Sequence, residues 1–510
     1  MAFRSILFDE PDGAIEPSVK APDFFRDLNL DQIVDGITAN RQEYDLKPFF
    51  HTPLTRPDTI AYRQEIMRDL EDAVRFGVFA SFSSRMRTMR QHRAAIAKLH
   101  CTHHKEGWFL EAASVYCEAI ESLRDELAKL TLNARGLQAF RDYLTQYAGS
   151  DAFRTLLTQV RHLKSRLSGI RYSLRIKDHC VTVSHYGTGI DYSAAIEEVF
   201  ARFKQGAVKD YRVKLPESSY MNHVKARVLE SVALLNPEIF AALSSFCVEH
   251  KDFVEGTIAV FDREIQFYLA YLEYLGSFKR AGLEFCYPRV SDACKEVFVR
   301  ESFDLALAGQ LIRENAAVVR NDFRLEGQER ILVVTGPNQG GKTTFARMFG
   351  QLHYLACLGG PVPGTEARLY RFEGLFTHFE RAESVGTLRG KLQDDLTRIH
   401  GILRQASPRS IVIMNEIFSS TTLQDAAYLG KKVLDRISQL DALCVCVTFL
   451  DELSSLNEKT VSVVASVDPD DPTMRTYRIE RKPADGLAYA LAIAERYRLT
   501  YACLKERMKL

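Results

Sequence analysis

The residues best suited to chemistry form one short stretch, from Gly336 to Thr344. Its spacing is Gly-x-x-x-x-Gly-Lys-Thr. In such a stretch the backbone N–H groups of a glycine-rich loop hold phosphates, the lysine reaches the terminal phosphates and the hydroxyl group ligates Mg²⁺. We therefore predict a site for ATP and Mg²⁺, with Lys342 in a catalytic role and Thr343 as a metal ligand, formed by Gly336, Pro337, Asn338, Gln339, Gly340, Gly341, Lys342, Thr343 and Thr344.

The flanking residues supply the context that this motif requires. The apolar run 331–334 precedes the loop and reads as a buried strand, and a helix is expected from Phe345 to Cys357. An ordinary glycine turn is the alternative, but it would not need a strand before it and a helix after it.

An acidic residue follows a second apolar run, Ile411 to Met414, which reads as another strand. This strand ends in Asn415-Glu416, where nucleotide triphosphatases usually carry an Asp that holds the Mg²⁺ shell and a Glu that activates water. Glu416 is the candidate general base, with a structural hydrogen bond to a neighbouring helix as its alternative role. Asn415 is the candidate second metal ligand, although its neutral amide brings no negative charge to the cation.

Two further polar segments are candidates for the same site. The hydroxyl-rich stretch 419–425 ends in Asp425, which either caps a helix or approaches the nucleotide of a partner subunit. Thr448 ends an apolar strand and precedes Phe449, so a polar strand end is expected near the terminal phosphate.

Composition limits what can be attached to this site. The chain has 510 residues, 46% of them apolar and 26% charged, which is typical of a soluble globular protein of roughly two to four domains. Its net charge of +1 means that any surface for nucleic acid must be local. No apolar run reaches the ~18 residues of a membrane span, the first residues do not form a secretory signal, and the ten cysteines are scattered. We expect a cytoplasmic chain with reduced thiols and no membrane contact.

Hydrophobic periodicity divides the chain into two parts near residue 288. From about 20 to 285 the helical period dominates, as in the stripes Ile120, Leu123, Leu127, Leu130 and Leu137, Phe140, Leu144, Tyr147, which we assign to the core. Afterwards short β-rich runs alternate with helices: 331–335, 410–414, 443–448, 461–467 and 475–479. The expected fold is multidomain, α followed by α/β with a largely parallel sheet.

One strand-like interruption breaks the helical part, at 172–184, and it predicts a β-hairpin. The surrounding window 161–227 holds thirteen Lys and Arg against six Asp and Glu. A solvated helical face explains many such runs, and contact with a phosphate backbone is the alternative.

The second part of the chain resembles the ATPase domain of the MutS family of DNA mismatch-repair proteins, whose phosphate loop reads Gly-Pro-Asn-Met-Gly-Gly-Lys-Ser-Thr. The segment 319–322 is similar to the family's approach to the nucleotide, which adds Asn321 to the predicted nucleotide contacts. The segments 358–363, 376–377 and 488–494 also resemble the family, and a fainter similarity covers the helical part from Phe50 onward.

This resemblance implies a domain order and partners. It implies a helical core and lever over 1–160, a clamp-like insertion with the hairpin over 161–227, returning lever helices over 228–287 and a P-loop ATPase domain over 288–510. It further implies a DNA-dependent ATPase of DNA repair or recombination that dimerises with a second copy through the ATPase domains. Its partner would be double-stranded or branched DNA, contacted through Arg175, Lys177, Lys209 and Arg212.

The sequence departs from the family pattern at four places. Asn415 stands for an Asp, Phe449 for a His, and Gly390 for a serine that reaches the other subunit's nucleotide. The segment 418–423 stands for the family's Gly-Arg-Gly-Thr-Ser-Thr loop. These changes predict slow hydrolysis and leave open a nucleotide-dependent DNA clamp or scaffold with negligible turnover. The core helices begin almost at once, so we expect no mismatch-reading or connector domain and no direct mismatch recognition. A GTPase or small-molecule kinase is disfavoured because no guanine-reading Asn-Lys-x-Asp element follows.

Overall fold

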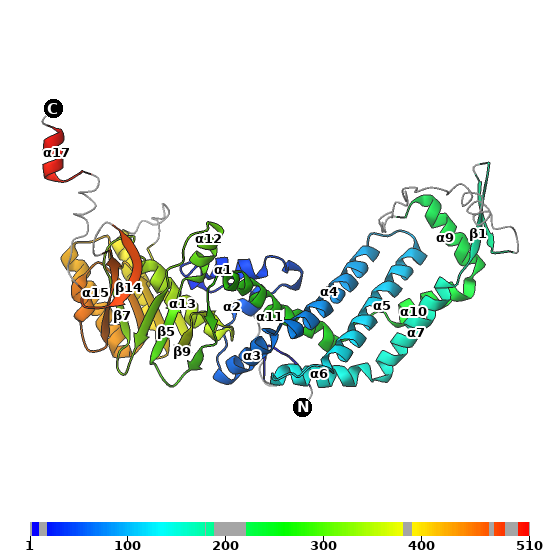
Figure 1. Ribbon diagram of the computed structural model, residues 1–510, viewed down its shortest axis with the longest axis horizontal. Coiled ribbons are helices and arrows are strands. Elements are labelled where there is room, and N and C mark those ends of the chain that lie inside the picture. Colours follow the sequence, from blue (N-terminus) through cyan, green and yellow to red (C-terminus); the bar gives the residue numbers. More distant parts are fainter. Residues whose placement is uncertain are drawn as a thin grey trace, which may run out of the picture. The chain divides into compact units, whose positions relative to one another are not determined.

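The computed structural model describes residues 3–9, 18–178, 180–187, 221–380, 390–468, 474–484 and 498–508. Their contacts form two compact units. Unit 1 draws on 1–3, 74–131 and 138–262, and unit 2 on 4–73, 132–137 and 263–510. Figure 1 shows the helices of unit 1 and the mixed helices and strands of unit 2.

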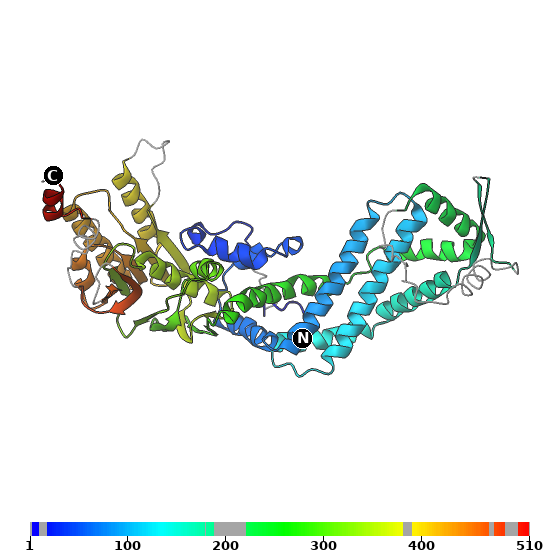
Figure 2. The same cartoon turned by 45° about the horizontal axis from the view of Figure 1, so that its top comes forward.

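Unit 1 is built from long helices: α4 (Ala73–Ile96), α5 (Thr102–Leu127), α6 (Arg135–Ala148), α7 (Asp151–Ser168), α9 (His223–Leu235), α10 (Pro237–Glu249) and the first part of α11 (Gly256–Arg280). α5 packs against α7, α9 and α10, and it runs alongside α4 in both ribbon views (Figures 1 and 2). The stripes predicted to be core are largely confirmed, since Ile120, Leu123, Leu127, Leu137, Phe140 and Leu144 are buried. Leu130 lies beyond the end of α5 and is partly exposed.

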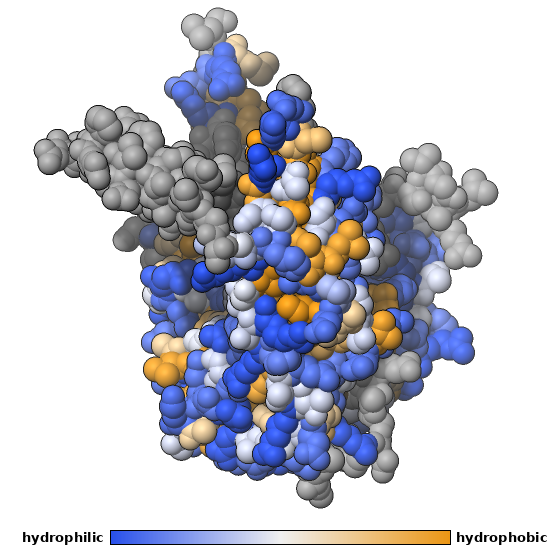
Figure 3. All heavy atoms as spheres, turned by 90° about the vertical axis from the view of Figure 1, so that its right-hand side faces the viewer, coloured by the Kyte–Doolittle hydropathy of each residue, from blue (hydrophilic) through white to orange (hydrophobic). Residues whose placement is uncertain are grey.

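The predicted hairpin is present in unit 1. β1 (Tyr172–Lys177) pairs antiparallel with β2 (Cys180–His185), and the register runs from Tyr172 opposite His185 to Lys177 opposite Cys180. Because side chains alternate along a strand, Tyr172, Leu174 and Ile176 share one face, and Arg175 and Lys177 share the other. Figure 3 looks onto the side of the molecule where β1 lies and shows apolar residues among hydrophilic ones.

Unit 2 is centred on a six-stranded sheet in the order β10-β11-β12-β7-β13-β14. The strands are β7 (Ile331–Thr335), β10 (Gly374–His378), β11 (Ser410–Asn415), β12 (Leu443–Val447), β13 (Thr460–Val467) and β14 (Arg475–Arg481). Neighbouring strands are parallel except for β14, which is antiparallel to β13. All five predicted strands and the largely parallel sheet are therefore confirmed. Its helices are α13 (Lys342–Cys357), α14 (Lys391–Gln405) and α15 (Leu423–Leu440).

A smaller sheet and short helices complete unit 2. The sheet has the order β4-β9-β5-β6, from β4 (Arg289–Ser291), β9 (Glu366–Tyr370), β5 (Val297–Ser302) and β6 (Asn321–Leu325). β3 (Phe285–Cys286) pairs with β8 (Val362–Pro363). The helices are α1 (Leu30–Thr38), α2 (Lys47–His51), α3 (Pro57–Leu70), α12 (Leu305–Arg313) and α17 (Tyr501–Arg507), with three short 3₁₀ turns at Asp23–Phe25, Gln42–Tyr44 and Asp451–Ser455.

A buried arginine explains why the N-terminal segment joins the α/β unit. Arg63 on α3 is 1% exposed, and its guanidinium donates to the carbonyl oxygen of Leu7 at 3.0 Å and to that of Leu358, just after α13, at 3.1 Å. Burial lowers the pKa of Arg63 to about 10, so the side chain stays charged at neutral pH. Contacts thus group 4–73 with 263–510, whereas the sequence suggested a boundary near 288; the predicted domain limits stay a prediction.

Membrane-spanning character is weak in the described residues. No single helix there has the length and apolar composition of a span, although α9 and α10, bent by 105°, would meet those criteria as a pair.

Candidate functional site: the phosphate loop and its strand ends

Three glycines shape the loop between β7 and α13. Gly336 and Gly341 have φ angles of 107° and 92°, which only glycine adopts without strain. A Cβ atom on Gly336 would lie 2.9 Å from the carbonyl oxygen of Ala465, and one on Gly340 would lie 2.9 Å from the Cβ of Ala465. The loop therefore packs closely on β13, and its backbone N–H groups lead into the N-terminus of α13, a site suited to phosphate.

Lys342 opens α13 and is folded back over the loop. Its Nζ donates to the carbonyl oxygens of Gly336 at 2.7 Å and Pro337 at 3.2 Å, and to Oδ1 of Asn338 at 3.2 Å. Burial lowers the pKa of Lys342, while the nearby carboxylate of Glu416 raises it. The ammonium group is thus held within the loop, where the exchange of three neutral acceptors for a phosphate would favour its charged form.

The two predicted metal ligands meet directly. Oγ1 of Thr343, in the first turn of α13, donates to Oδ1 of Asn415, at the end of β11, over 2.8 Å. Both atoms are neutral oxygens, which Mg²⁺ can take as ligands. The ion commonly completes its coordination shell with water and phosphate oxygens. The pair therefore fits a Mg²⁺ ion that takes its negative charge from the phosphates.

Glu416 leaves the strand in an unusual backbone conformation. Its φ is 53°, its N–H donates to the carbonyl oxygen of Val447 at 2.9 Å, and its side chain is half-buried. The turn that follows is equally uncommon, since Phe418 has a φ of 60° and is completely buried in the core of unit 2. Non-glycine residues with positive φ are rare and often mark functional turns. The Glu416 carboxylate is also one of the charges that counter the lowering of the Lys342 pKa by burial.

The neighbouring strand ends are polar but differ in exposure. Thr448 follows β12 and is 2% exposed; its N–H donates to the carbonyl oxygen of Val334, and its hydroxyl accepts from the N–H of Leu450. Phe449, by contrast, is 48% exposed. The predicted polar strand end is thus occupied in local hydrogen bonding, with an aromatic ring beside it.

The helix that follows the hydroxyl-rich stretch is capped by Thr422, and Asp425 is the third residue of that helix. Thr422 is the N-cap of α15: its hydroxyl oxygen accepts from the N–H of Asp425 at 3.2 Å, and its hydroxyl group lies 2.8 Å from Oδ2 of Asp425. Thr422 thus caps the helix start, and the Asp425 carboxylate accepts a hydrogen bond from the capping hydroxyl.

Gly390 occupies the N-cap of α14 and is exposed, and among the described residues no atom would lie within 4 Å of a Cβ added there. Within the described part of the chain, packing therefore does not explain the glycine.

Asn321 joins two sheets. Its Nδ2 donates to the carbonyl oxygen of Tyr477 at 3.1 Å, and its Oδ1 accepts from the N–H of Ile479 at 2.7 Å. Both ends of the amide are therefore used to hold β6 to β14. A contact between Asn321 and nucleotide stays a prediction.

Two residues at the loop escaped the sequence analysis. Arg475 on β14 donates from Nε to the carbonyl oxygen of Asn338 at 3.3 Å. Tyr477 has a φ of 59°, is half exposed, and its carbonyl oxygen lies 3.6 Å from a Cβ built on Gly341. Both come from an edge strand more than 130 positions after the loop, with no motif of its own. A bulky residue at positive φ is the signal that only a structure provides.

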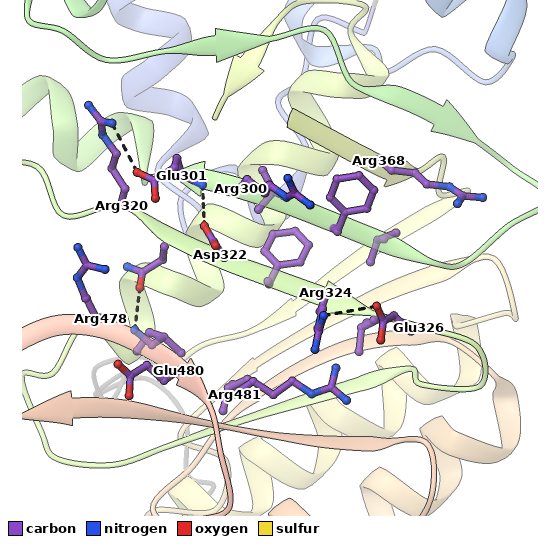
Figure 4. Close-up of a pocket in the computed structure, with 18 of the residues that line it drawn as sticks. Arg300, Glu301, Arg320, Asp322, Arg324, Glu326, Arg368, Arg478, Glu480 and Arg481 are labelled. Atoms are coloured by element: carbon purple, nitrogen blue, oxygen red, sulfur yellow. Dashed lines mark hydrogen bonds and ion pairs between the residues drawn. The ribbon is translucent and has the colours of Figure 1, made fainter. Parts of the chain in front are cut away.

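A pocket of about 710 Å³ adjoins the Asn321 contact, between β5, β6 and β14 (Figure 4). Most arginines along it pair with acids: Arg320 with Glu301 at 3.5 Å and Arg324 with Glu326 at 3.7 Å. These pairs leave little uncompensated positive charge for an anion.

The residues predicted to contact DNA are only partly described. Arg175 and Lys177 are exposed on the same face of β1. Lys209 and Arg212 lie outside the described residues, as does the segment 488–494.

The strand, the phosphate loop and the helix that follows it define a P-loop α/β domain. Comparison with known proteins identifies the family of this domain, because residues 332–506 match the family model of MutS domain V. This match places the P-loop domain of the chain in the MutS family.

Individual proteins similar to this chain carry names of the same family. Over 198 residues the chain is 31% identical to "Endonuclease MutS2" of Gemmatimonas aurantiaca, which covers 38% of this chain and 24% of that protein. It is 32% identical over 145 residues to "DNA mismatch repair protein msh3" of Botryotinia fuckeliana (28% and 13%). It is 30% identical over 179 residues to "DNA mismatch repair protein MutS" of Zymomonas mobilis (34% and 20%). The matched segments thus span a quarter or less of each relative.

Proposed function

We propose that this protein binds ATP with Mg²⁺ at the phosphate loop and couples nucleotide binding and slow hydrolysis to DNA binding in DNA repair or recombination. The observation that carries the proposal is the 2.8 Å contact between Thr343 and Asn415. It brings the two predicted metal ligands together, from α13 and β11, at the loop that holds Lys342.

Each residue has a role in this proposal. The loop N–H groups and Lys342 bind the phosphates, and Thr343 and Asn415 hold Mg²⁺, which would neutralise phosphate charge. Glu416 orients the attacking water and accepts its proton. Because Asn415 is uncharged, the cation depends on the phosphates for its negative ligands, and we expect turnover to be slow.

DNA and a second copy of the chain are the proposed partners. The exposed basic face of β1 supports contact with a phosphate backbone, and the names of the relatives support a role in DNA repair. Dimerisation through the ATPase domains rests on the resemblance alone.

A second function, a nucleotide-dependent DNA clamp or scaffold with negligible hydrolysis, is favoured by two observations. Phe449 places an exposed ring after β12, and Gly390 has no side chain although the site has room for one.

Steady-state phosphate release, with and without DNA, separates the two functions. We expect weak activity in the wild type, none in Glu416→Gln, and a several-fold increase in Asn415→Asp because a carboxylate strengthens Mg²⁺ binding. Lys342→Ala, which should also lose ATP in isothermal titration, gives the background. If phosphate release by the wild type equals this background and Asn415→Asp does not change it, the nucleotide-dependent clamp is the function that remains. Unaltered ATP affinity in Lys342→Ala would refute the loop assignment itself.

A further inference from the structure

The edge strand β14 has an irregular register where it passes the phosphate loop. Arg475 and Ile479 both pair with β13, and three residues of β14 lie between them. Their partners, Val467 and Ala465, are separated by only one residue. β14 therefore forms a bulge directly after Arg475. Bulges often redirect a side chain beside an active site.

Contacts from two neighbouring strands hold this bulge. Asn321 of β6 donates from Nδ2 to the carbonyl oxygen of Tyr477 at 3.1 Å and accepts at Oδ1 from the N–H of Ile479 at 2.7 Å. On the other side, the hydroxyl group of Thr476 donates to the carbonyl oxygen of Ser466 at 2.8 Å. The bulge is therefore fixed between β6 and β13, and the position from which Arg475 leaves the strand is fixed with it.

The side chain of Arg475 reaches the end of the loop that faces the terminal phosphates. Its Nε donates to the carbonyl oxygen of Asn338 at 3.3 Å. The side-chain Oδ1 of the same asparagine accepts from Nζ of Lys342 at 3.2 Å. Both cations thus contact one loop residue. Because the lysine of such a loop reaches the terminal phosphates, Arg475 lies at the same end of the nucleotide site.

Lys342 and Arg475 are close enough for their charges to interact. Burial is the main reason that the pKa of Lys342 is lowered; the carboxylate of Glu416 raises it, and the charge of Arg475 lowers it further. Two cations that repel each other favour an anion bound between them, because the anion attracts both. The phosphates of a bound nucleotide supply such an anion.

An arginine is well suited to a terminal phosphate. Its guanidinium stays charged at physiological pH and presents its N–H donors in a planar fork, which matches the oxygens of a phosphate. The hydrogen bond from Nε to the carbonyl oxygen of Asn338 orients this fork beside the loop. The side chain is half-buried, so solvent screens its charge less than that of a fully exposed arginine.

The metal ligands of this site give a second cation a purpose. Thr343 and Asn415 bring no negative charge to Mg²⁺, so the metal depends on the phosphates to hold it. When Mg²⁺ is scarce, less of the phosphate charge is neutralised by the metal. A guanidinium that the fold holds at the loop neutralises part of that charge without any metal.

From this arrangement we propose that Arg475 binds the terminal phosphate of ATP from the edge strand of the same chain, and that it makes the loop prefer ATP over ADP even without Mg²⁺. The inference rests on the proposed function, because it assigns a further residue to the same ATP site. Arg475 binds the phosphate in this assignment, and Glu416 remains the group that orients water.

Isothermal titration of the full-length protein with ATP and with ADP, each in Mg²⁺ and in EDTA, tests the proposal. Hydrogen bonds to charged groups are strong, so Arg475→Gln should weaken ATP binding by about tenfold or more. Its ADP affinity should stay close to that of the wild type, because ADP lacks the third phosphate. In EDTA the wild type should still prefer ATP, and Arg475→Gln should lose this preference.

Two further variants control for effects on the fold and on net charge. Arg475→Lys keeps the charge but not the planar fork, so it should lose only part of the ATP affinity. Arg481→Gln is the matched control, because Arg481 lies on the same strand but donates from Nη1 to Glu329, just before β7, at 3.1 Å. This variant should keep both affinities. Thermal unfolding without nucleotide shows that each variant is folded.

The outcomes separate the role of Arg475 from the proposed function. A loss of affinity that is restricted to ATP supports the role. An equal loss for ATP and ADP would show that Arg475 only tethers β14 to the loop, and unchanged ATP affinity in Arg475→Gln would remove it from the site. Either result overturns the inference and leaves ATP binding standing. No ATP binding by the wild type would refute the proposed function and the inference together.

Discussion

The phosphate loop of unit 2 and a pocket of about 650 Å³ in unit 1, lined by Trp108, are built in opposite ways. The loop is made of backbone: Gly336 and Gly341 hold positive φ angles, and added Cβ atoms on Gly336 and Gly340 would collide with β13. The pocket is made of side chains from six elements, and its glycine, Gly107, has free space beside it. A site made of backbone therefore strictly limits which residue types a few adjacent positions can hold. A site made of side chains sets weaker limits, at positions far apart in the sequence.

The largest effect should come from the aromatic core of unit 1, which tests its dependence on side-chain packing. Phe261 is completely buried and stacks on Phe140 with centroids 3.3 Å apart. Phe261→Ala should lower the free energy of unfolding by about 3–5 kcal/mol. Chemical denaturation followed by circular dichroism measures it, with the conservative Phe261→Leu losing much less. Equal losses in the two variants would contradict the packing argument.

A backbone substitution at the loop tests the other side of the comparison. Gly336→Ala places a methyl group 2.9 Å from the Ala465 carbonyl oxygen at a φ of 107°, so it should cost about 1–3 kcal/mol and abolish ATP binding. Gly401→Ala is the control, because Gly401 lies in α14 and a Cβ added there would meet no atom within 4 Å. This variant should keep both its stability and its ATP binding. Thermal unfolding and isothermal titration with ATP are the measurements. Normal ATP affinity in Gly336→Ala would show that the loop tolerates a side chain.

The hairpin should show a smaller, salt-dependent effect. Arg175→Glu combined with Lys177→Glu should weaken duplex binding and reduce the slope of log K against log salt by about 2, since each phosphate contact contributes about 0.9. Arg154→Glu combined with Lys129→Glu, at two exposed positions of unit 1, controls for the change in net charge. Fluorescence anisotropy at several salt concentrations gives both quantities. An unaltered slope would exclude this face of the hairpin from the DNA contact.

The smallest effect concerns an ion cluster between α15 and β12, which belongs to neither site. Burial would raise the pKa of Asp441, but hydrogen bonds from Lys295 and Lys459 lower it to about 2. A depressed folded-state pKa stabilises the protein above the unfolded pKa, and this stabilisation is lost as the pH falls through about 4 to 2. The side chain is 35% exposed, so Asp441→Asn should cost only about 1 kcal/mol at pH 7.

Unfolding of wild type and Asp441→Asn between pH 7 and pH 3 checks this prediction. The difference in stability should shrink toward acid, and a difference that grew instead would reverse the sign assigned to Asp441.

Local features of the structure followed from local sequence. The strands 331–335 and 460–467, the helix after the loop and the hairpin at 172–185 each have a hydrophobic period or a turn that a few neighbouring residues determine. The sequence predicted Thr343 and Asn415 as metal ligands from the loop motif and the strand end. It did not predict that the two side chains form a direct hydrogen bond.

By itself, the sequence determined the phosphate loop, the parallel sheet and the family, because glycine spacing and buried strands constrain adjacent residues. Only the tertiary structure decided that Asn321 holds β6 to β14, that Arg475 reaches the loop, that Arg63 ties the N-terminal segment to the end of α13, and that His92, His104 and Trp108 share a pocket with α9 and α10. These contacts join residues far apart in the chain, and their formation depends on how whole helices and strands pack, which no local period encodes.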